Sequence, residues 1–134
     1  MLFIDKKLNP HAYNPLALAY IGDTVYDLFV RSKILCRGNR HVTDMHKEAV
    51  SFVKAQAQAK SIHEIENMLT DEEINVFKWG RNAKSNTVPK NAAVKDYHAA
   101  TGFETLIGFL YMNDEWERLG ELLEKSFEVI DNSK

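Results

Sequence analysis

Two long apolar segments constrain the fold of this chain more than any other feature of its sequence. Residues 16–35 (LALAYIGDTVYDLFVRSKIL) and residues 97–112 would carry apolar side chains on nearly every side of a helix. A helix that is apolar all round has to be covered by other elements, so each segment predicts a central, buried helix. Strand patterns are almost absent from the rest of the chain. The predicted fold class is therefore all-α.

Helix signals in the remaining sequence predict the elements that would cover these two helices. Asn14, followed by a proline, is typical of an N-cap with proline at the first helical position. Thr43 is predicted to cap a second helix, and residues 55–68 have the alanine, glutamine and glutamate content of a third. Thr70 and Glu73 form a capping-box pattern that predicts the start of a fourth helix.

Charge is segregated along the chain, although the net charge is only -2. Residues 81–95 (RNAKSNTVPKNAAVK) are polar and lack an apolar period, which predicts a structured loop. Residues 78–95 contain five basic residues and no acidic one. Residues 114–130, predicted to form an amphipathic last helix, are strongly acidic. Because a polyanion responds to local charge, the basic loop predicts a nucleic-acid contact and the acidic helix should lie away from it.

Length and composition narrow the class of protein. The 134 residues have the size of one domain, predicted to span residues 1–134. The sequence contains no run of eighteen apolar residues, so no transmembrane helix is predicted. The N-terminus lacks the pattern of a secretory signal. Cys36 is the only cysteine, which argues against an internal disulfide and a cysteine metal cluster. The prediction is a cytoplasmic protein with no membrane partner.

Each of the two apolar segments contains a carboxylate where a carboxylate is costly. Asp23 lies in the middle of the first segment and Glu104 in the second, each with a glycine (Gly22 and Gly108) within about a turn. A buried carboxylate needs a partner or a metal, and a glycine inside a helix makes sense where another group approaches closely. If the two helices pack together, Asp23 and Glu104 would converge on one cation. Mg²⁺ is predicted, because it prefers oxygen ligands and keeps several waters.

The residues alone leave other interpretations open. An aspartate beside a glycine can mark a helix break, and a glutamate in a helix usually points to solvent. Asp27, four residues after Asp23 on the same helical face, is another candidate ligand. Lys47, Lys54 and Lys60 could extend the basic face, but the pattern favours ordinary lysines of a helix surface. Aromatic residues at helical spacing are predicted to be core, some of them at a dimer contact: Tyr20, Tyr26, Phe29, Phe103, Phe109 and Tyr111.

Three motifs resemble the ribonuclease III family. Residues 18–27 (LAYIGDTVYD) are similar to the signature helix of that family, and residues 101–108 (TGFETLIG) to its second metal-binding helix. Residues 80–85 (GRNAKS), followed by residues 89–91 (PKN), resemble the short bacterial branch named Mini-ribonuclease III. That branch lacks the separate domain that binds double-stranded RNA. The motifs occur in the expected order and the resemblance covers nearly the whole chain.

The resemblance implies an all-helical nuclease domain that acts as a homodimer and cuts double-stranded RNA with Mg²⁺. Asp23 and Glu104 would be both catalytic residues and metal ligands, and Asp27 would have no metal role. The implied substrate is a ribosomal RNA precursor, at the ends of 23S rRNA, and a ribosomal protein is a candidate for presenting it. The basic loop would contact RNA phosphates and 2′-hydroxyl groups through Arg81, Asn82, Lys84, Ser85, Thr87 and Lys90.

The chain departs from full-length ribonuclease III at three acidic positions, which fall on Leu16, Ala19 and Thr101. Mini-ribonuclease III is expected to lack the same groups. The resemblance therefore implies a site with two protein carboxylates, in which water or RNA phosphate completes the metal's shell. The alternative is a non-catalytic helical dimer that binds structured RNA or a protein partner.

Overall fold

The structure is a computed structural model that describes residues 3–84 and 93–134. In these ranges the chain forms the helices α1 (Pro15–Cys36), α2 (Val42–Val53), α3 (Ala55–Ile65), α4 (Asp71–Arg81), α5 (Val94–Met112) and α6 (Trp116–Asp131), with short 3-10 helices η1 (Pro10–Ala12) and η2 (Glu66–Met68). The described ranges contain no β-strand, which confirms the all-α prediction. None of their helices combines the length and apolar character needed to cross a membrane.

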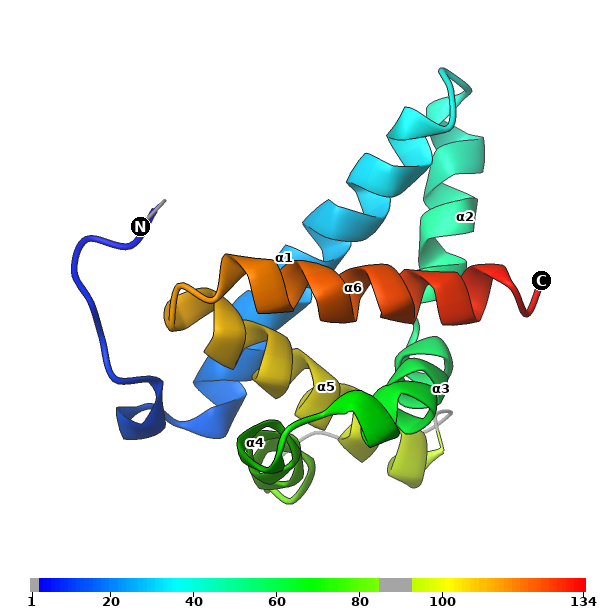
Figure 1. The fold of residues 1–134 in the computed structure, drawn as a ribbon. Helices are drawn as coiled ribbons and strands as arrows, with labels where there is room; N and C mark the ends of the chain where they lie inside the picture. Colours follow the sequence, from blue (N-terminus) through cyan, green and yellow to red (C-terminus); the bar gives the residue numbers. More distant parts are fainter. Residues whose placement is uncertain (1–2, 85–92) are drawn as a thin grey trace.

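Helix α5 lies at the centre of the fold (Figure 1). Every residue between Ala100 and Tyr111 is buried except Glu104. Helices α1, α3 and α4 pack against α5, while α6 packs mainly against α3. Burial from several directions accounts for the apolar character of residues 97–112, since no side of this helix reaches solvent over most of its length. The predicted central helix is confirmed.

Helix α1 is buried on one side only, which differs from the prediction. Tyr26 and Ile34 belong to the core, whereas Tyr20, Leu28 and Leu35 have exposed fractions of 80%, 65% and 58%. Figure 1 shows the C-terminal half of α1 and helix α2 projecting from the body as an arm of two helices. The core prediction is therefore confirmed for Tyr26, whereas Tyr20 is exposed and stays a candidate for the predicted dimer contact. An apolar pattern predicts that a helix face is covered, but it does not show whether the same chain or a partner covers that face.

The predicted start of α2 and the predicted end of α3 differ from the observed ones. Helix α2 begins at Val42, with His41 at the N-cap position and no side-chain cap, so the predicted cap Thr43 lies inside the helix. Helix α3 ends at Ile65, and residues 66–68 tighten into a 3-10 turn. Such differences of one to three residues are common, because helix ends fray and local sequence specifies them weakly.

A backbone motif joins α5 to α6, and because of it α6 begins later in the chain than predicted. Asp114 has a left-handed φ of 58°. Its N–H donates to the carbonyl of Tyr111 at 3.1 Å, and the N–H of Glu115 donates to the carbonyl of Leu110 at 2.9 Å. This pair of bonds is the Schellman motif, which ends a helix. As a result α6 begins at Trp116 and not at residue 114.

The predicted capping box at the start of α4 is confirmed and also links α4 to α6. The N–H of Glu73 donates to the Thr70 hydroxyl at 3.1 Å, and the Glu73 carboxylate accepts from the Thr70 N–H at 2.9 Å. Arg118 of α6 donates to both carboxylate oxygens of Glu73 at 2.8 Å, and to the carbonyl of Met68 at 2.6 Å. The hydrogen bond from Arg118 lowers the pKa of Glu73, which stays ionised although its side chain is buried.

Candidate active site

Helices α1 and α5 cross where two glycines let their backbones touch. A Cβ atom built on Gly22 would lie 1.8 Å from the carbonyl oxygen of Glu104. One built on Gly108 would lie 1.9 Å from the carbonyl oxygen of Leu18. Neither approach is possible for another residue type, so this crossing requires glycine on both helices. The expected close approach at Gly22 is confirmed, and the approaching group is the backbone of α5.

The crossing brings together the two carboxyl groups that the sequence singled out. The carboxyl of Glu104 lies in hydrogen-bonding contact with that of Asp23. Asp23 is exposed, whereas Glu104 is partly buried. Desolvation by burial, followed by the hydrogen bond and negative charge of Asp23, raises the pKa of Glu104 to about 9. Without a cation, Glu104 therefore keeps its proton at neutral pH.

Gln58 of α3 is a third polar group at this site, and it was not among the residues predicted from the sequence. Its Nε2 donates to the carbonyl of Val53 at 2.9 Å and to Oε2 of Glu104 at 3.5 Å. Its Oε1 is buried without a hydrogen-bond partner in the described part of the chain. Gln58 shares the buried face of α3 with Ile62 and Ile65, at positions i, i+4 and i+7. A polar residue on that face was the available signal.

The paired carboxyl groups fit a hard divalent cation that takes few protein ligands. Within the described ranges, no three His, Cys, Asp or Glu side chains lie close enough together to hold a metal ion. A structural zinc site needs four such ligands, so the donor set is unsuited to it. Mg²⁺ is commonly held by one or two carboxylates, with water and phosphate oxygens as its other ligands. A cation here would also take the place of the Glu104 proton and offset the repulsion between the two ionised carboxylates.

Other candidate positions around the site contribute no further carboxylate. Asp27, left open by the residue pattern, pairs with Arg31 one turn along α1, at 3.1 Å. Ala19 and Thr101 are both buried. The Thr101 hydroxyl donates to the carbonyl of Tyr97 within its own helix, at 3.0 Å. Neither Ala19 nor Thr101 therefore adds an acidic group beside Asp23 and Glu104.

The predicted RNA-contacting loop is only partly described. The predicted loop spans residues 81–95, but Arg81 belongs to α4 and residues 94–95 belong to α5. The Arg81 guanidinium lies 5.5 Å from the centre of the Phe77 ring, and its Nε donates to Oδ1 of Asn82 at 3.3 Å. Lys84 is exposed. The other predicted contacts lie outside the described residues: Ser85, Thr87 and Lys90.

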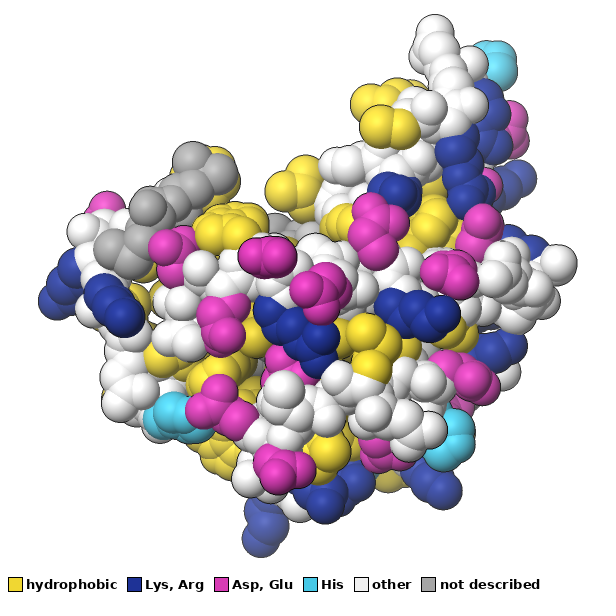
Figure 2. Space-filling model, viewed as in Figure 1, with side chains coloured by type: hydrophobic (Ala, Val, Ile, Leu, Met, Phe, Trp, Pro, Cys, Tyr) yellow, Lys and Arg dark blue, Asp and Glu magenta, His cyan; other side chains and the backbone are white. Residues whose placement is uncertain are grey.

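Acidic side chains spread over the surface that α6 presents, shown in Figure 2. The exposed carboxylates of this helix are Glu117, Glu121, Glu124 and Glu128. No candidate for RNA contact comes from this surface. Arg118 and Lys125 of the same helix pair with Glu121 and Glu128, so this surface carries both charges with an acidic excess.

Known proteins resemble this chain over most of its length. A family model described as "Ribonuclease III domain" matches residues 16–115, a range that contains both Asp23 and Glu104. "Mini-ribonuclease 3" of Thermoanaerobacter sp. (strain X514) is 50% identical over 118 residues, which cover 88% of this chain and 83% of that protein. "Mini-ribonuclease 3" of Clostridium tetani is 50% identical over 121 residues, covering 90% and 80%. The crystal structure of a Fusobacterium nucleatum protein matches with a TM-score of 0.79 and 27% identity, covering 87% and 93%.

Proposed function

Because this chain belongs to the ribonuclease III family, we infer that it cuts double-stranded RNA with the help of Mg²⁺ bound by Asp23 and Glu104. The observation that carries this proposal is the contact between the two carboxyl groups at the crossing of α1 and α5. We propose further that the whole chain, residues 1–134, acts as one nuclease domain.

The chain's own residues would hold the ion and control its proton balance. A bound Mg²⁺ would polarise the phosphodiester and lower the pKa of the water that attacks phosphorus. Glu104 has to lose its proton for the ion to bind, and the amide of Gln58 favours that loss by donating to the carboxylate. Two carboxylates leave most of the ion's shell free, so RNA phosphate would complete it, and affinity for Mg²⁺ without RNA should be weak.

The RNA would be held through its backbone near the end of α4. Arg81 and Lys84 supply positive charge, and Asn82 supplies an amide donor. Ser85, Thr87 and Lys90 are proposed to join them, although they lie outside the described residues. Such groups contact phosphate and 2′-hydroxyl oxygens, so they recognise the A-form shape of the duplex more than its sequence.

A homodimer is the proposed active form. Four apolar side chains on α1 and at the start of α2 are exposed: Tyr20 at 80%, Leu28 at 65%, Leu35 at 58% and Val42 at 75%. Large exposed apolar surfaces of this kind commonly mark protein contacts. A second copy of the chain would cover them. Asp23 lies on the same helix between Tyr20 and Leu28, so the dimer would place its two sites near one another.

The biological substrate is proposed from the resemblance to Mini-ribonuclease III. It is a ribosomal RNA precursor, cut at the ends of 23S rRNA, and a ribosomal protein would present it. Such a substrate implies that the enzyme works in the cytoplasm.

The proposed function is tested by incubating the purified chain with a labelled RNA duplex and with the corresponding single strand, in Mg²⁺ or in EDTA. We expect cleavage of the duplex in Mg²⁺ alone. Asp23→Asn should lose more activity than the roughly 10–100-fold decrease caused by removing an outer-shell group. Asp27→Asn is the matched control, because it removes the same charge from the same helix, at a position where the carboxylate pairs with Arg31. It should cleave like the wild type.

Two results would contradict the proposal. Equal cleavage by the wild type and Asp23→Asn would exclude Asp23 from the chemistry. Duplex binding without any cleavage would instead favour the alternative, a non-catalytic helical dimer that binds structured RNA or a protein partner.

A further inference from the structure

We propose that a basic groove beside the catalytic pair binds the phosphate backbone of the duplex, so that RNA is held at a second surface as well as at the point of cleavage. The groove has a volume of about 720 Å³ and is formed by parts of α2, α3, α4, α5 and α6. This inference rests on the proposed function, in which double-stranded RNA is the substrate.

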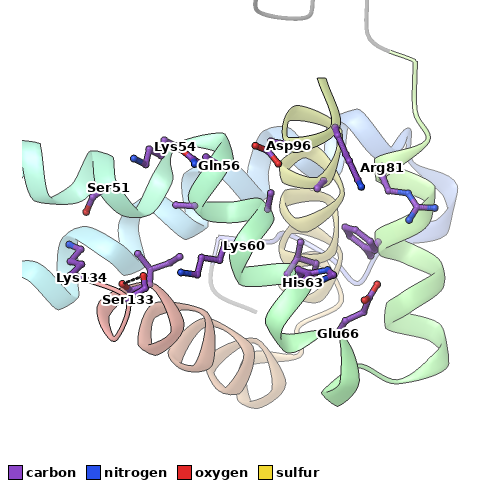
Figure 3. Close-up of a pocket in the computed structure, with 17 residues that line it drawn as sticks. Ser51, Lys54, Gln56, Lys60, His63, Glu66, Arg81, Asp96, Ser133 and Lys134 are labelled. Atoms are coloured by element: carbon purple, nitrogen blue, oxygen red, sulfur yellow. Dashed lines mark hydrogen bonds between the residues drawn. The ribbon is translucent and has the colours of Figure 1, made fainter. Parts of the chain in front are cut away.

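Figure 3 shows that the basic groove runs along α3. Lys54 lies at the N-terminal end of this helix. Lys60 points into the space between α3 and the end of α6, where Lys134 lies. Glu66 and Arg81 line the other end, where α3 faces α4. Helix α3 therefore presents a continuous wall along which an extended ligand can lie.

The lining of the basic groove is positively charged. Among the described residues that line it, the carboxylates are Glu66 and Asp96, and the cations are Lys54, Lys60, Arg81, Lys95 and Lys134. Lys54, Lys60 and Lys95 are exposed, and within the described ranges none of the three forms an ion pair with a carboxylate. Their charges are therefore available to an external anion.

Basic side chains on several other surfaces have acidic partners. Lys33 binds Glu124 at 3.0 Å, and Arg37 binds Asp131 at 2.7 Å. On α6, Arg118 and Lys125 pair with carboxylates on neighbouring turns. Cations that are already paired add little to the attraction for a polyanion. The unpaired lysines of the basic groove thus leave it positive charge that RNA phosphates can use, although the chain as a whole is slightly acidic.

The basic groove adjoins the catalytic pair through two helices. Ala57 of α3 lines the groove, and the next residue, Gln58, donates to Glu104. Ala99 lines it from α5, the helix that carries Glu104. Five residues separate Ala99 from Glu104, which is about 7.5 Å of helix rise. The groove and the acid pair thus share α3 and α5 as their walls.

The spacing of the lysines suits a duplex better than a small anion. Lys54 and Lys60 are six residues apart, or roughly 9 Å along α3. Double-stranded nucleic acid carries about one backbone charge per 1.7 Å of axis, so a passing duplex offers several phosphates over this distance. A free phosphate ion could contact only one end of the groove. Backbone contacts of this kind would not depend on base sequence.

The variant Lys54→Gln/Lys60→Gln tests the proposal. Both side chains are exposed, so thermal melting followed by circular dichroism should match the wild type. The matched control is Lys33→Gln/Lys125→Gln, which removes the same charge from lysines that pair with Glu124 and Glu128 outside the groove. Binding of a fluorescent RNA duplex to the full chain is measured in EDTA, which prevents cleavage, over a series of KCl concentrations.

The groove variant should bind the duplex roughly tenfold more weakly near physiological salt. The slope of log affinity against log salt should fall by about one for each phosphate that the variant no longer neutralises. The control variant should retain wild-type affinity and slope. Equal affinity and slope for the wild type and the groove variant would overturn this inference and leave the proposed function intact. Failure of the wild type to bind the duplex would overturn both.

Discussion

The carboxyl of Glu104 ionises much less readily in the folded chain than in the unfolded chain. Burial and the adjacent Asp23 raise its pKa from 4.5 to about 9. A group whose pKa rises on folding favours the folded state most below its unfolded pKa. Its contribution to the free energy of unfolding is then lost as the pH rises from about 4.5 towards about 9. In the absence of metal, ionised Glu104 therefore destabilises the folded chain increasingly as the pH rises, first because the carboxylate is desolvated and then because Asp23 repels it.

Replacing Glu104 by glutamine should remove this dependence, because the amide cannot ionise. In EDTA at pH 9 we expect Glu104→Gln to unfold at a higher temperature than the wild type, whereas at pH 5 the two should be close. Thermal melts at both pH values measure the difference. A variant that is less stable than the wild type at pH 9 would show that ionised Glu104 does not destabilise the folded chain at that pH.

Gln58 should act on the metal through Glu104. Replacement by leucine removes the donor at 3.5 Å from Oε2 of Glu104, so the carboxyl should hold its proton more tightly and the Mg²⁺ needed for half-maximal cleavage should rise, by about 10–100-fold. Stability should change by only about 1 kcal/mol, because the unpartnered Oε1 is removed along with the bond to Val53. Asn75→Leu, at an exposed position of α4 that does not line the basic groove, is the control and should leave the Mg²⁺ requirement unchanged.

At the scale of helices, the crossing of α1 and α5 determines whether the site exists. Gly22→Ala would place a methyl group 1.8 Å from a backbone oxygen, which no rotamer can relieve. We expect a loss of stability at or above the upper end of the roughly 1–3 kcal/mol seen for overpacking, together with loss of cleavage. Urea unfolding measures the first effect.

Gly120→Ala is the matched control for this prediction. Gly120 is also inside a helix, but a Cβ there meets no atom within 4 Å. Alanine should therefore stabilise the chain by about 0.5–1 kcal/mol, because it lowers the entropy lost on folding. A Gly22→Ala variant as stable as this control would mean that the helices do not cross as closely as described.

At the scale of the whole molecule, the fold was largely predictable because its signals are local. The apolar patterns of residues 16–35 and 97–112 predict buried helices, and the bonds between Thr70 and Glu73 span only three residues. Asp23 and Glu104 could be selected because a carboxylate in an apolar helix is unusual. The expectation that their helices pack together is confirmed, and their role as metal ligands stays a proposal.

Features that depend on tertiary contacts could not be predicted in this way. The hydrogen bond from Gln58 to Glu104 joins residues 46 positions apart. Lys54 and Lys60 look like ordinary surface lysines until the groove between helices is known. Tyr20 has an apolar side chain at core spacing, yet it is exposed. Periodicity shows that a face is apolar, and it cannot show which chain covers that face.

The exposed side of α1 gives a prediction for the assembly. Leu28→Glu places a charge on a side chain that is 65% exposed and that the proposed dimer would bury. The variant should remain folded and shift towards the monomer in light scattering at a given concentration. Val94→Glu, at an exposed apolar position on α5, should leave the dimer unchanged. A wild type that is monomeric at all concentrations would contradict the proposed assembly.

The central claim is that Asp23 and Glu104 hold one divalent ion between them. Its most direct test is a crystal structure with Mn²⁺ in place of Mg²⁺, in which anomalous scattering locates the metal. We predict an anomalous peak roughly 2.0–2.2 Å from one carboxylate oxygen of Asp23 and one of Glu104. An ion bound by neither carboxylate, or by only one of them with the other still protonated and turned away, would contradict the account.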